Sequence, residues 1–359
     1  MIKMPTMKPA VYFSDKITQE AVAGLLDASG IKNVVRPHDL TAIKLHFGEK
    51  GNRGYVRPDL LKPVVEKIKS SGALPFVTDA NTIYVGERAN AIQHLAVAHQ
   101  HGFTYENLGC PVIIADGLRG NAEVCVPVNL RHFKSVKIAN SIFYSDSIVF
   151  VSHFKGHELT GFGGAIKNVG MGCATRAGKY EMHNSVLPKL KIELCNSCGV
   201  CVKWCPGKAL TLPSKNSVIQ FDPTKCIGCG ECILSCKQKV FTIPWDDPAK
   251  KCQEKIVEYT AGVLQGKLKT KSVLFLNVLN FITKYCDCYE TKETPLIDDI
   301  GMVASEDPVA VDQASVDIIN KKCGYDFFRK HWPEIDWEIQ MNYGQEVGLG
   351  SRDYALRNL

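Results

Sequence analysis

The chain has 359 residues, which is enough for two domains or for one domain that carries an insertion. Apolar residues make up 45% of it, charged residues make up 22%, and the formal net charge is +6 at pH 7. This composition is that of an ordinary globular protein, and the modest charge does not favour nucleic-acid binding. A membrane span is not expected, because the chain lacks a run of about 18 uncharged apolar residues.

The part of the chain before residue 160 alternates predicted strands and helices. Short apolar runs predict strands at residues 10–13, 41–47, 74–78, 112–115 and 147–152. Apolar side chains that recur on one face predict helices at residues 18–28, 60–69 and 89–100. Strands separated by helices predict an α/β fold, with a mainly parallel sheet that helices cover on both faces.

Polar side chains gather just after these strands, at the ends where a parallel sheet binds its ligands. They are Lys44, His46, Glu49, Asp79, Asn81, Asp116, His153, Lys155, His157 and Glu158. Each one taken alone is more often a solvated loop residue than a functional one. Five polar strand ends in series favour a shared cleft.

Residues 161–172 contain five glycines, which allow a ligand to approach the backbone closely. Lys167 within this stretch is suited to an anion such as a phosphate or a carboxylate. The stretch is not a P-loop, because no Gly-Lys-Ser/Thr follows the glycines, and it does not contain a GxGxxG fingerprint. A flexible hinge into the next segment is the alternative interpretation.

Residues 195–236 contain two copies of one cysteine pattern, in which three cysteines at steps of three precede a fourth. The first copy is Cys195, Cys198, Cys201 and Cys205, with Pro206 after it. The second copy is Cys226, Cys229, Cys232 and Cys236, with Lys237 where such runs often have proline. The chain has fifteen cysteines and its first residues lack the apolar core of a signal peptide. We therefore expect a cytoplasmic protein whose cysteines ligate metal.

Runs of this kind bind two [4Fe–4S] clusters, and the fourth cysteine of each run completes the other cluster. The ligands predicted for cluster 1 are Cys195, Cys198, Cys201 and Cys236. Those predicted for cluster 2 are Cys226, Cys229, Cys232 and Cys205. Two zinc sites are the alternative, but zinc sites do not explain the third cysteine at the same step in both runs.

The chain returns to α/β character after the cysteine runs, with a predicted helix at 248–265, a buried strand at 273–282 and a helix at 309–321. The strand leads to Cys286 and Cys288, which are suited to an additional metal site or to a redox pair, or are simply buried thiols. We expect one cleft to contain seven residues, in catalytic or metal-binding roles. They are Lys44, His46, Lys167, Asn168, Cys286, Cys288 and Asp307.

Five short motifs together resemble the signatures of the DUF362 iron–sulfur centre proteins. They are at residues 44–49, 153–157, 163–168, 286–288 and 305–312. The resemblance covers nearly the whole chain and implies a prokaryotic protein. It also implies a bacterial-type, two-cluster ferredoxin domain at 190–245, inserted into an α/β domain made of 1–189 and 246–359. It does not supply a reaction.

Two classes of function remain open. In the first, the protein is an oxidoreductase whose clusters pass electrons to a small-molecule substrate in the α/β domain. In the second, it is an electron carrier or a cluster-handling accessory protein that docks a redox partner protein. The amount of polar and thiol chemistry outside residues 190–245 favours the first, and the absence of a recognisable flavin or nicotinamide fingerprint favours the second. Whether a flavin or a further metal is bound stays open.

Overall fold

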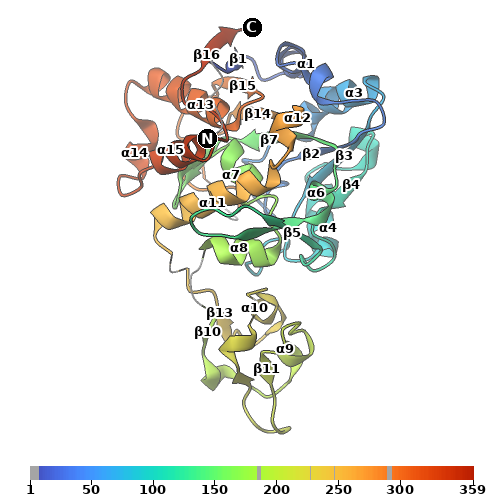
Figure 1. Ribbon diagram of the computed structural model, residues 1–359, viewed down its shortest axis with the longest axis vertical. Coiled ribbons are helices and arrows are strands. Elements are labelled where there is room, and N and C mark those ends of the chain that lie inside the picture. Colours follow the sequence, from blue (N-terminus) through green and yellow to red (C-terminus); the bar gives the residue numbers. More distant parts are fainter. Residues whose placement is uncertain (1–7, 184–186, 227, 246, 289–292) are drawn as a thin grey trace.

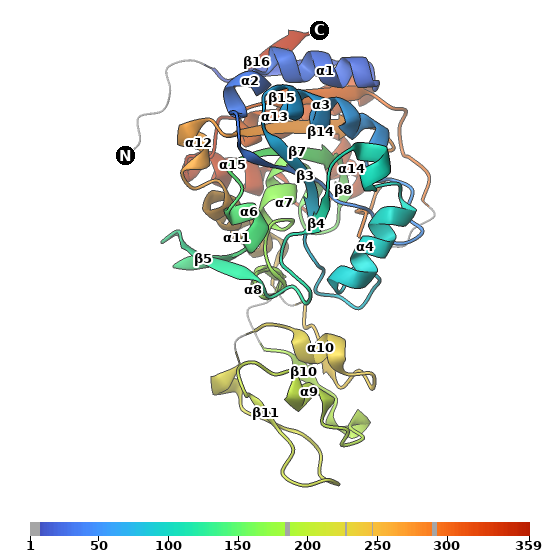
Figure 2. The same ribbon diagram turned by 90° about the vertical axis from the view of Figure 1, so that its right-hand side faces the viewer.

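The computed structural model describes residues 8–183, 187–226, 228–245, 247–288 and 293–359. Eight strands form one mixed, mostly parallel sheet in the order β16-β1-β15-β14-β7-β2-β3-β4 (Figures 1 and 2). Their bounds are β1 (Ala10–Ser14), β2 (Leu40–Lys44), β3 (Leu74–Asp79), β4 (Val112–Ile114), β7 (Ser147–His153), β14 (Val273–Leu279), β15 (Gly301–Ser305) and β16 (Ala355–Asn358). Within this sheet β15 alone runs antiparallel to its neighbours.

Helices cover both faces of the sheet, as the alternating pattern predicts. One apolar cluster includes Val149 and Val151 and packs under α1 (Gln19–Ala28), α2 (Ile31–Val34) and α3 (Lys62–Ser70). The other includes Ile148 and Phe150, with α7 (Ala165–Gly170), α11 (Ala249–Val263), α13 (Pro308–Cys323) and α15 (Glu338–Glu346). Successive side chains of β7 therefore enter opposite cores, because side chains alternate along a strand.

Further short elements complete the α/β part. They are η1 (Pro58–Leu61), α4 (Ala91–Gln100), α5 (Tyr105–Leu108), α6 (Asn140–Phe143), α8 (Arg176–His183), α12 (Lys267–Thr270), α14 (Phe327–His331), and the strand pairs β5 (Glu123–Pro127) with β6 (Ser135–Ala139) and β8 (Lys155–His157) with β9 (Gly161–Gly163). The predicted strands before residue 160 and the predicted helices are confirmed, whereas β15, β16 and β5–β6 were not expected.

None of the described helices is long and apolar enough to cross a membrane.

Residues 187–245, here called the cysteine lobe, lie beside α8 and give no strand to the large sheet (Figures 1 and 2). Two small antiparallel pairs form instead, β10 (Lys189–Leu190) with β13 (Phe241–Thr242), and β11 (Leu210–Thr211) with β12 (Gln220–Phe221). The other elements are η2 (Ile192–Leu194), α9 (Val200–Lys203), η3 (Pro223–Lys225) and α10 (Glu231–Ser235). The lobe has a small apolar core of its own, to which Tyr180 of α8 also belongs.

The two halves of the cysteine lobe repeat one backbone conformation. Cys195 and Cys226 each end a short 3-10 turn, with φ/ψ of −74°/122° and −74°/121°. Gly199 and Gly230 each precede a short helix with φ 69° and ψ 2°, a left-handed conformation that glycine adopts without strain. The repeat in the cysteine spacing is therefore also a repeat in the fold.

Candidate functional site

A cavity of about 530 Å³ opens where β2, β3 and β7 end. Six of the seven residues expected to converge line it, namely Lys44, His46, Lys167, Asn168, Cys286 and Cys288. Of the other polar residues expected near strand ends, Asp79, His153, Lys155, His157 and Glu158 also line it. Parallel strands bring their carboxyl ends to one edge, so residues far apart in the sequence meet there.

The expectation that Asp307 joins this cavity is wrong. Asp307 follows β15, which runs antiparallel to β14, so Ser305 pairs with Phe275 near the beginning of β14. The cavity lies beyond the other end of β14. The Asp307 carboxylate instead caps α13 by accepting hydrogen bonds from the backbone N–H of Ala310 at 2.8 Å and of Ser351 at 3.0 Å. Its role is to hold the start of that helix.

Three more of the predicted polar residues, Glu49, Asn81 and Asp116, are buried but do not line the cavity. Asp116 Oδ1 accepts hydrogen bonds from the backbone and side-chain N–H groups of Asn81, at 3.0 and 2.8 Å. Glu49 Oε2 lies 3.2 Å from Nε of Arg88. These contacts join the loops that follow β2, β3 and β4.

Asp79 is the centre of a buried charge network on the cavity wall. Its Oδ1 lies 3.0 Å from Lys44 Nζ, and its Oδ2 lies 3.3 Å from Arg88 Nη1. Burial raises the pKa of Asp79, but Lys44 and the contact with His94, at 3.5 Å between His94 Nε2 and Asp79 Oδ2, lower it, and the net pKa is well below the usual value. Arg88 and His94 were not identified from the sequence, because each comes from a loop or helix without a recognisable motif.

The side chain of Asn168 holds neighbouring residues of the cavity wall in place through hydrogen bonds. Its Oδ1 accepts a hydrogen bond from Lys44 Nζ at 2.9 Å, and its Nδ2 donates to Ser152 Oγ at 3.1 Å. Two glycines nearby are needed for the same packing: a Cβ on Gly172 would lie 2.2 Å from Asn168 O, and one on Gly164 would lie 2.3 Å from Asp312 Oδ1. At these two positions glycine is needed because other atoms of the protein, and not a ligand, lie close to its Cα.

Among the lysines that line the cavity in the described part of the chain, Lys167 differs in having no partner. Lys44 is paired with Asp79 and Lys155 lies 3.2 Å from Asp287 Oδ2, whereas Lys167 makes no hydrogen bond or ion pair with the residues that the structure describes. Burial lowers the pKa of Lys167 and the nearby sulfurs of Cys286 and Cys288 raise it, with a net upward shift. The side chain therefore keeps its positive charge at neutral pH.

Cys286 and Cys288 form a hydrogen-bonded pair beside His46. The backbone N–H of Cys288 lies 3.2 Å from Cys286 Sγ, and Cys288 Sγ lies 3.5 Å from His46 Nε2. The hydrogen bond with Cys286 lowers the pKa of Cys288, with further lowering by His46 and Lys167, and it raises the pKa of Cys286. The pair is therefore asymmetric, with the thiolate favoured on Cys288.

Within the described ranges, no group of three or more His, Cys, Asp or Glu side chains is arranged to hold a single metal ion. The cysteine runs nevertheless bring thiols of different repeats together. Burial raises the pKa of Cys201 to about 11, and the next contributions come from Cys236, Cys198 and Cys195. Burial also raises the pKa of Cys232. Smaller increases come from the nearby sulfurs of Cys229, Cys226 and Cys205, and then from Cys201. Cys201 of the first run therefore has Cys236, the last cysteine of the second run, as a neighbour. Cys232 of the second run likewise has Cys205, the last cysteine of the first run, as a neighbour.

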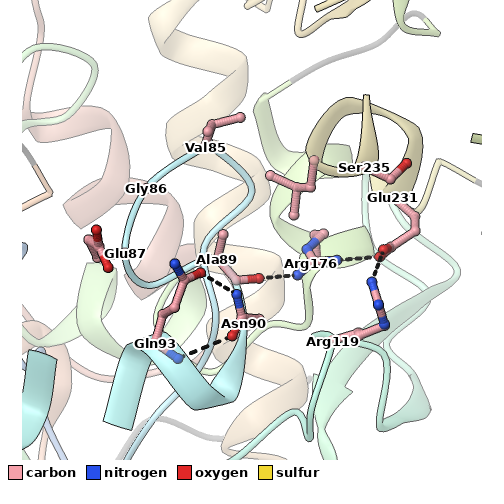
Figure 3. Close-up of a pocket in the computed structure, with 11 residues that line it drawn as sticks. Val85, Gly86, Glu87, Ala89, Asn90, Gln93, Arg119, Arg176, Glu231 and Ser235 are labelled. Carbon is pink, nitrogen blue, oxygen red and sulfur yellow. Dashed lines mark hydrogen bonds and ion pairs between the residues drawn. The ribbon is translucent and has the colours of Figure 1, made fainter. Parts of the chain in front are cut away.

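An ion-pair triad joins the cysteine lobe to the α/β part. Glu231 of α10 lies between Cys229 and Cys232, and its two carboxylate oxygens lie 2.7 Å from Arg119 Nη1 and 2.5 Å from Arg176 Nη1 (Figure 3). A second pocket, of about 380 Å³, lies at this junction.

Helix α8 connects this junction to the cavity. Arg176 at its beginning makes the ion pair with Glu231, and Lys179 and His183 further along line the cavity. The His183 ring packs edge-on against Trp245 at the end of the cysteine lobe, at 4.8 Å between centroids. One short helix therefore contacts both the second cysteine run and the cavity.

Two solved structures are similar to this chain, both with a TM-score of 0.40. One is the lactate racemase apoprotein from Thermoanaerobacterium thermosaccharolyticum, at 10% sequence identity over 89% of this chain. The other is a protein from Thermotoga maritima, at 12% identity over 86% of this chain. The chain covers 59% of the length of each of these proteins. No curated protein matches it.

The family model "Domain of unknown function (DUF362)" matches residues 41–317, which include the strand ends that form the cavity, the glycine-rich stretch, the cysteine runs and the Cys286–Cys288 pair. This match spans well over half of the chain. The chain therefore belongs to the DUF362 family.

Proposed function

We propose that this protein is an iron–sulfur oxidoreductase, in which a ferredoxin-like domain at residues 190–245 holds two [4Fe–4S] clusters and supplies electrons to the cavity. The observation that carries the proposal is the crossed grouping of the thiols: Cys236 is a neighbour of Cys201, and Cys205 is a neighbour of Cys232. Two-cluster ferredoxin runs require this exchange of the fourth ligand, whereas two independent zinc sites do not.

The residues of the lobe fit such clusters in chemistry as well as in grouping. The cluster 1 ligands would be Cys195, Cys198, Cys201 and Cys236, and the cluster 2 ligands would be Cys226, Cys229, Cys232 and Cys205. When bound, the clusters supply one-electron transfer. The repeated turns at Gly199 and Gly230 hold the three-cysteine loops in the same shape, and the ion pairs of Glu231 fasten the second loop to α8.

The cavity is the proposed place of reaction, and its uncommitted Lys167 favours a small anionic substrate. Lys167 and Cys286 line the same cavity, which is the arrangement that a substrate site needs and a plain electron carrier does not. The contact of α8 with both Glu231 and the cavity supports a functional link between the two parts.

Protein purified without oxygen tests this proposal through its iron content. We expect about eight iron atoms and about eight acid-labile sulfides per chain, and an EPR signal of reduced [4Fe–4S] clusters after addition of dithionite. Tightly bound zinc in place of iron, with no visible absorption band, would show that the proposal is wrong.

The cysteine lobe is also the proposed docking surface for a redox partner protein. Its charged side chains are eight lysines, Glu193, Asp222 and Glu231. Of the three carboxylates, Glu231 is already ion-paired with Arg119 and Arg176. All eight lysines are exposed: Lys189, Lys191, Lys203, Lys208, Lys215, Lys225, Lys237 and Lys239. Ile192, Leu194 and Val200, which are 38%, 43% and 39% exposed, flank Cys195 and Cys198. A surface with many exposed lysines and a few exposed apolar side chains fits an acidic electron carrier.

Replacement of Lys191 and Lys203 by glutamine is expected to slow electron transfer from an acidic flavodoxin several-fold at low salt, because opposite charges steer the encounter. Stopped-flow measurement over a range of ionic strength checks this, and the difference should vanish near 0.5 M salt. Reduction by dithionite should be unchanged. Replacement of Lys269 and Lys271, on the α/β part, is the control. An equal loss in both double variants would contradict docking at the lobe.

A further inference from the structure

We propose that Cys286 and Cys288 are a redox-active dithiol that exchanges with small anionic disulfides in the cavity. This activity goes beyond the proposed electron transfer and does not need the clusters. The oxidant is the disulfide itself, a chemical class that fits a site with two adjacent thiols and a lysine, Lys167, that has no ion-pairing partner among the described residues.

The backbone between the two thiols brings them within bonding reach. Residues 287 and 288 form a turn, and the Cys288 N–H lies 3.2 Å from Cys286 Sγ, so the chain folds back on the first thiol. Residues two apart have Cα atoms at most about 7 Å apart, and a turn shortens this into the range of disulfides. An intramolecular disulfide therefore requires only a local adjustment.

The turn is anchored through the residue between the thiols. Asp287 Oδ1 lies 2.8 Å from His153 Nδ1, and Asp287 Oδ2 lies 3.2 Å from Lys155 Nζ. The Asp287 carbonyl also accepts a hydrogen bond from Glu49 N–H at 3.0 Å. With this residue held at both its side chain and its backbone, the flanking thiols keep their positions beside the cavity.

The two thiols differ in access, which assigns their roles. Cys286 is 3% exposed, whereas Cys288 is partly exposed, contacts His46 and lines the cavity together with Lys167. The accessible thiol is the one that an incoming disulfide meets first. The buried thiol is positioned to attack the product of that first step.

The exchange balances in two steps. Cys288 Sγ attacks one sulfur of the substrate disulfide as the thiolate, the S–S bond breaks, and one substrate thiolate leaves and takes up a proton from water. Cys286 Sγ then attacks Cys288 Sγ in the mixed disulfide and releases the second thiolate, which takes up the Cys286 proton. One substrate disulfide is reduced to two thiols, and the two cysteines are oxidised to one disulfide.

Lys167 provides the substrate preference. It is half-buried, it lines the same cavity, and it has no hydrogen-bonding or ion-pairing partner among the described residues. A carboxylate on the substrate would gain a charge-assisted hydrogen bond there, and an ammonium group would be repelled.

A tryptic peptide isolates this reaction from the other thirteen cysteines. Cleavage after Lys284 and Lys292 releases residues 285–292, in which Cys286 and Cys288 are the only cysteines. The full-length, anaerobically purified protein is treated with 3,3′-dithiodipropionate, which is anionic, or with cystamine, which is cationic and of similar size. Free thiols are then alkylated, and the mass of the peptide is measured by mass spectrometry.

We expect the wild-type peptide to lose the mass of two hydrogens and to escape alkylation. Cys286→Ser should trap half of the probe on Cys288, and Cys288→Ser should leave Cys286 alkylated. Lys167→Gln should slow the reaction with dithiodipropionate roughly tenfold, the loss of one charge-assisted contact, without slowing that with cystamine. Cys323→Ser, outside the cavity, is the control for general effects of removing a thiol.

Two results would overturn the inference. One is a wild-type peptide that stays a fully alkylated dithiol with both probes, together with a Cys286→Ser variant that traps nothing. The other is one metal ion per chain, in addition to cluster iron, that is lost from both serine variants. Iron content and EPR of the same samples report the clusters separately, so failure of the dithiol and failure of the proposed electron transfer are distinguishable.

Discussion

The double variant Cys205→Ala/Cys229→Ala is expected to keep one complete cluster, with about four iron atoms per chain. Both residues are neighbours of Cys232, so under the proposed assignment both substitutions remove ligands of cluster 2. The variant Cys201→Ala/Cys205→Ala is expected to damage both clusters, because Cys201 belongs with Cys195, Cys198 and Cys236. Under the proposed ligand assignment, Cys201 and Cys205 lie in one run but bind different clusters.

Iron analysis and EPR of anaerobically reconstituted protein measure this difference. The first variant should show the simple spectrum of one isolated cluster, without the broadening that two neighbouring reduced clusters cause. Cys125→Ala/Cys323→Ala, which removes two thiols outside the cysteine lobe, should keep both clusters. If each run held its own cluster, the outcomes of the two cysteine-lobe variants would be exchanged.

The free energy of unfolding is expected to fall by about 3 kcal/mol between pH 6.5 and pH 4 because of His94 alone. His94 is fully buried. Burial lowers its pKa and the nearby Asp79 raises it, and the net pKa is about 4. Below pH 6.5 the unfolded chain protonates this histidine, while the folded protein leaves it neutral until about pH 4. The unfolded state therefore gains stability as the pH falls through this window.

Urea unfolding followed by circular dichroism at pH 7 and at pH 5 measures the effect. His94→Gln should reduce the difference between the two pH values, because glutamine does not titrate. His99→Gln is the matched control, since His99 is exposed on the same helix. The pH dependence should be unchanged in that control. An unaltered pH difference in His94→Gln would contradict a neutral His94 in the folded state.

Local spacing accounts for what could be predicted of the site. Lys44, His46, Lys167 and Asn168 line one cavity with Cys286 and Cys288, and each lies at the end of a buried strand or in a glycine-rich stretch. Parallel strands share the edge at which they end, so position in the sequence sufficed. The same reasoning failed for Asp307, since the direction of a strand depends on its neighbours in the sheet.

The partners of the buried charges could not be predicted. Asp79 contacts Lys44 from β2, Arg88 from a loop and His94 from α4, and the Arg176–Glu231 pair joins α8 to the cysteine lobe. These contacts connect residues without a fixed separation in the chain. They form because a buried carboxylate is costly unless cations or other polar groups surround it, and the folded chain supplies those that are near.

The sequence by itself determined the alternating α/β pattern, the membership of the motifs in one family and the repeat of the two cysteine runs, because these depend on residue type and short-range spacing. Only the tertiary structure decided that β15 runs against its neighbours, that Gly164 and Gly172 make room for the protein's own atoms, and that Lys167 has no hydrogen-bonding or ion-pairing partner among the described residues. The physical reason is that strand direction, close packing and the pairing of charges are set by contacts between distant parts of the chain.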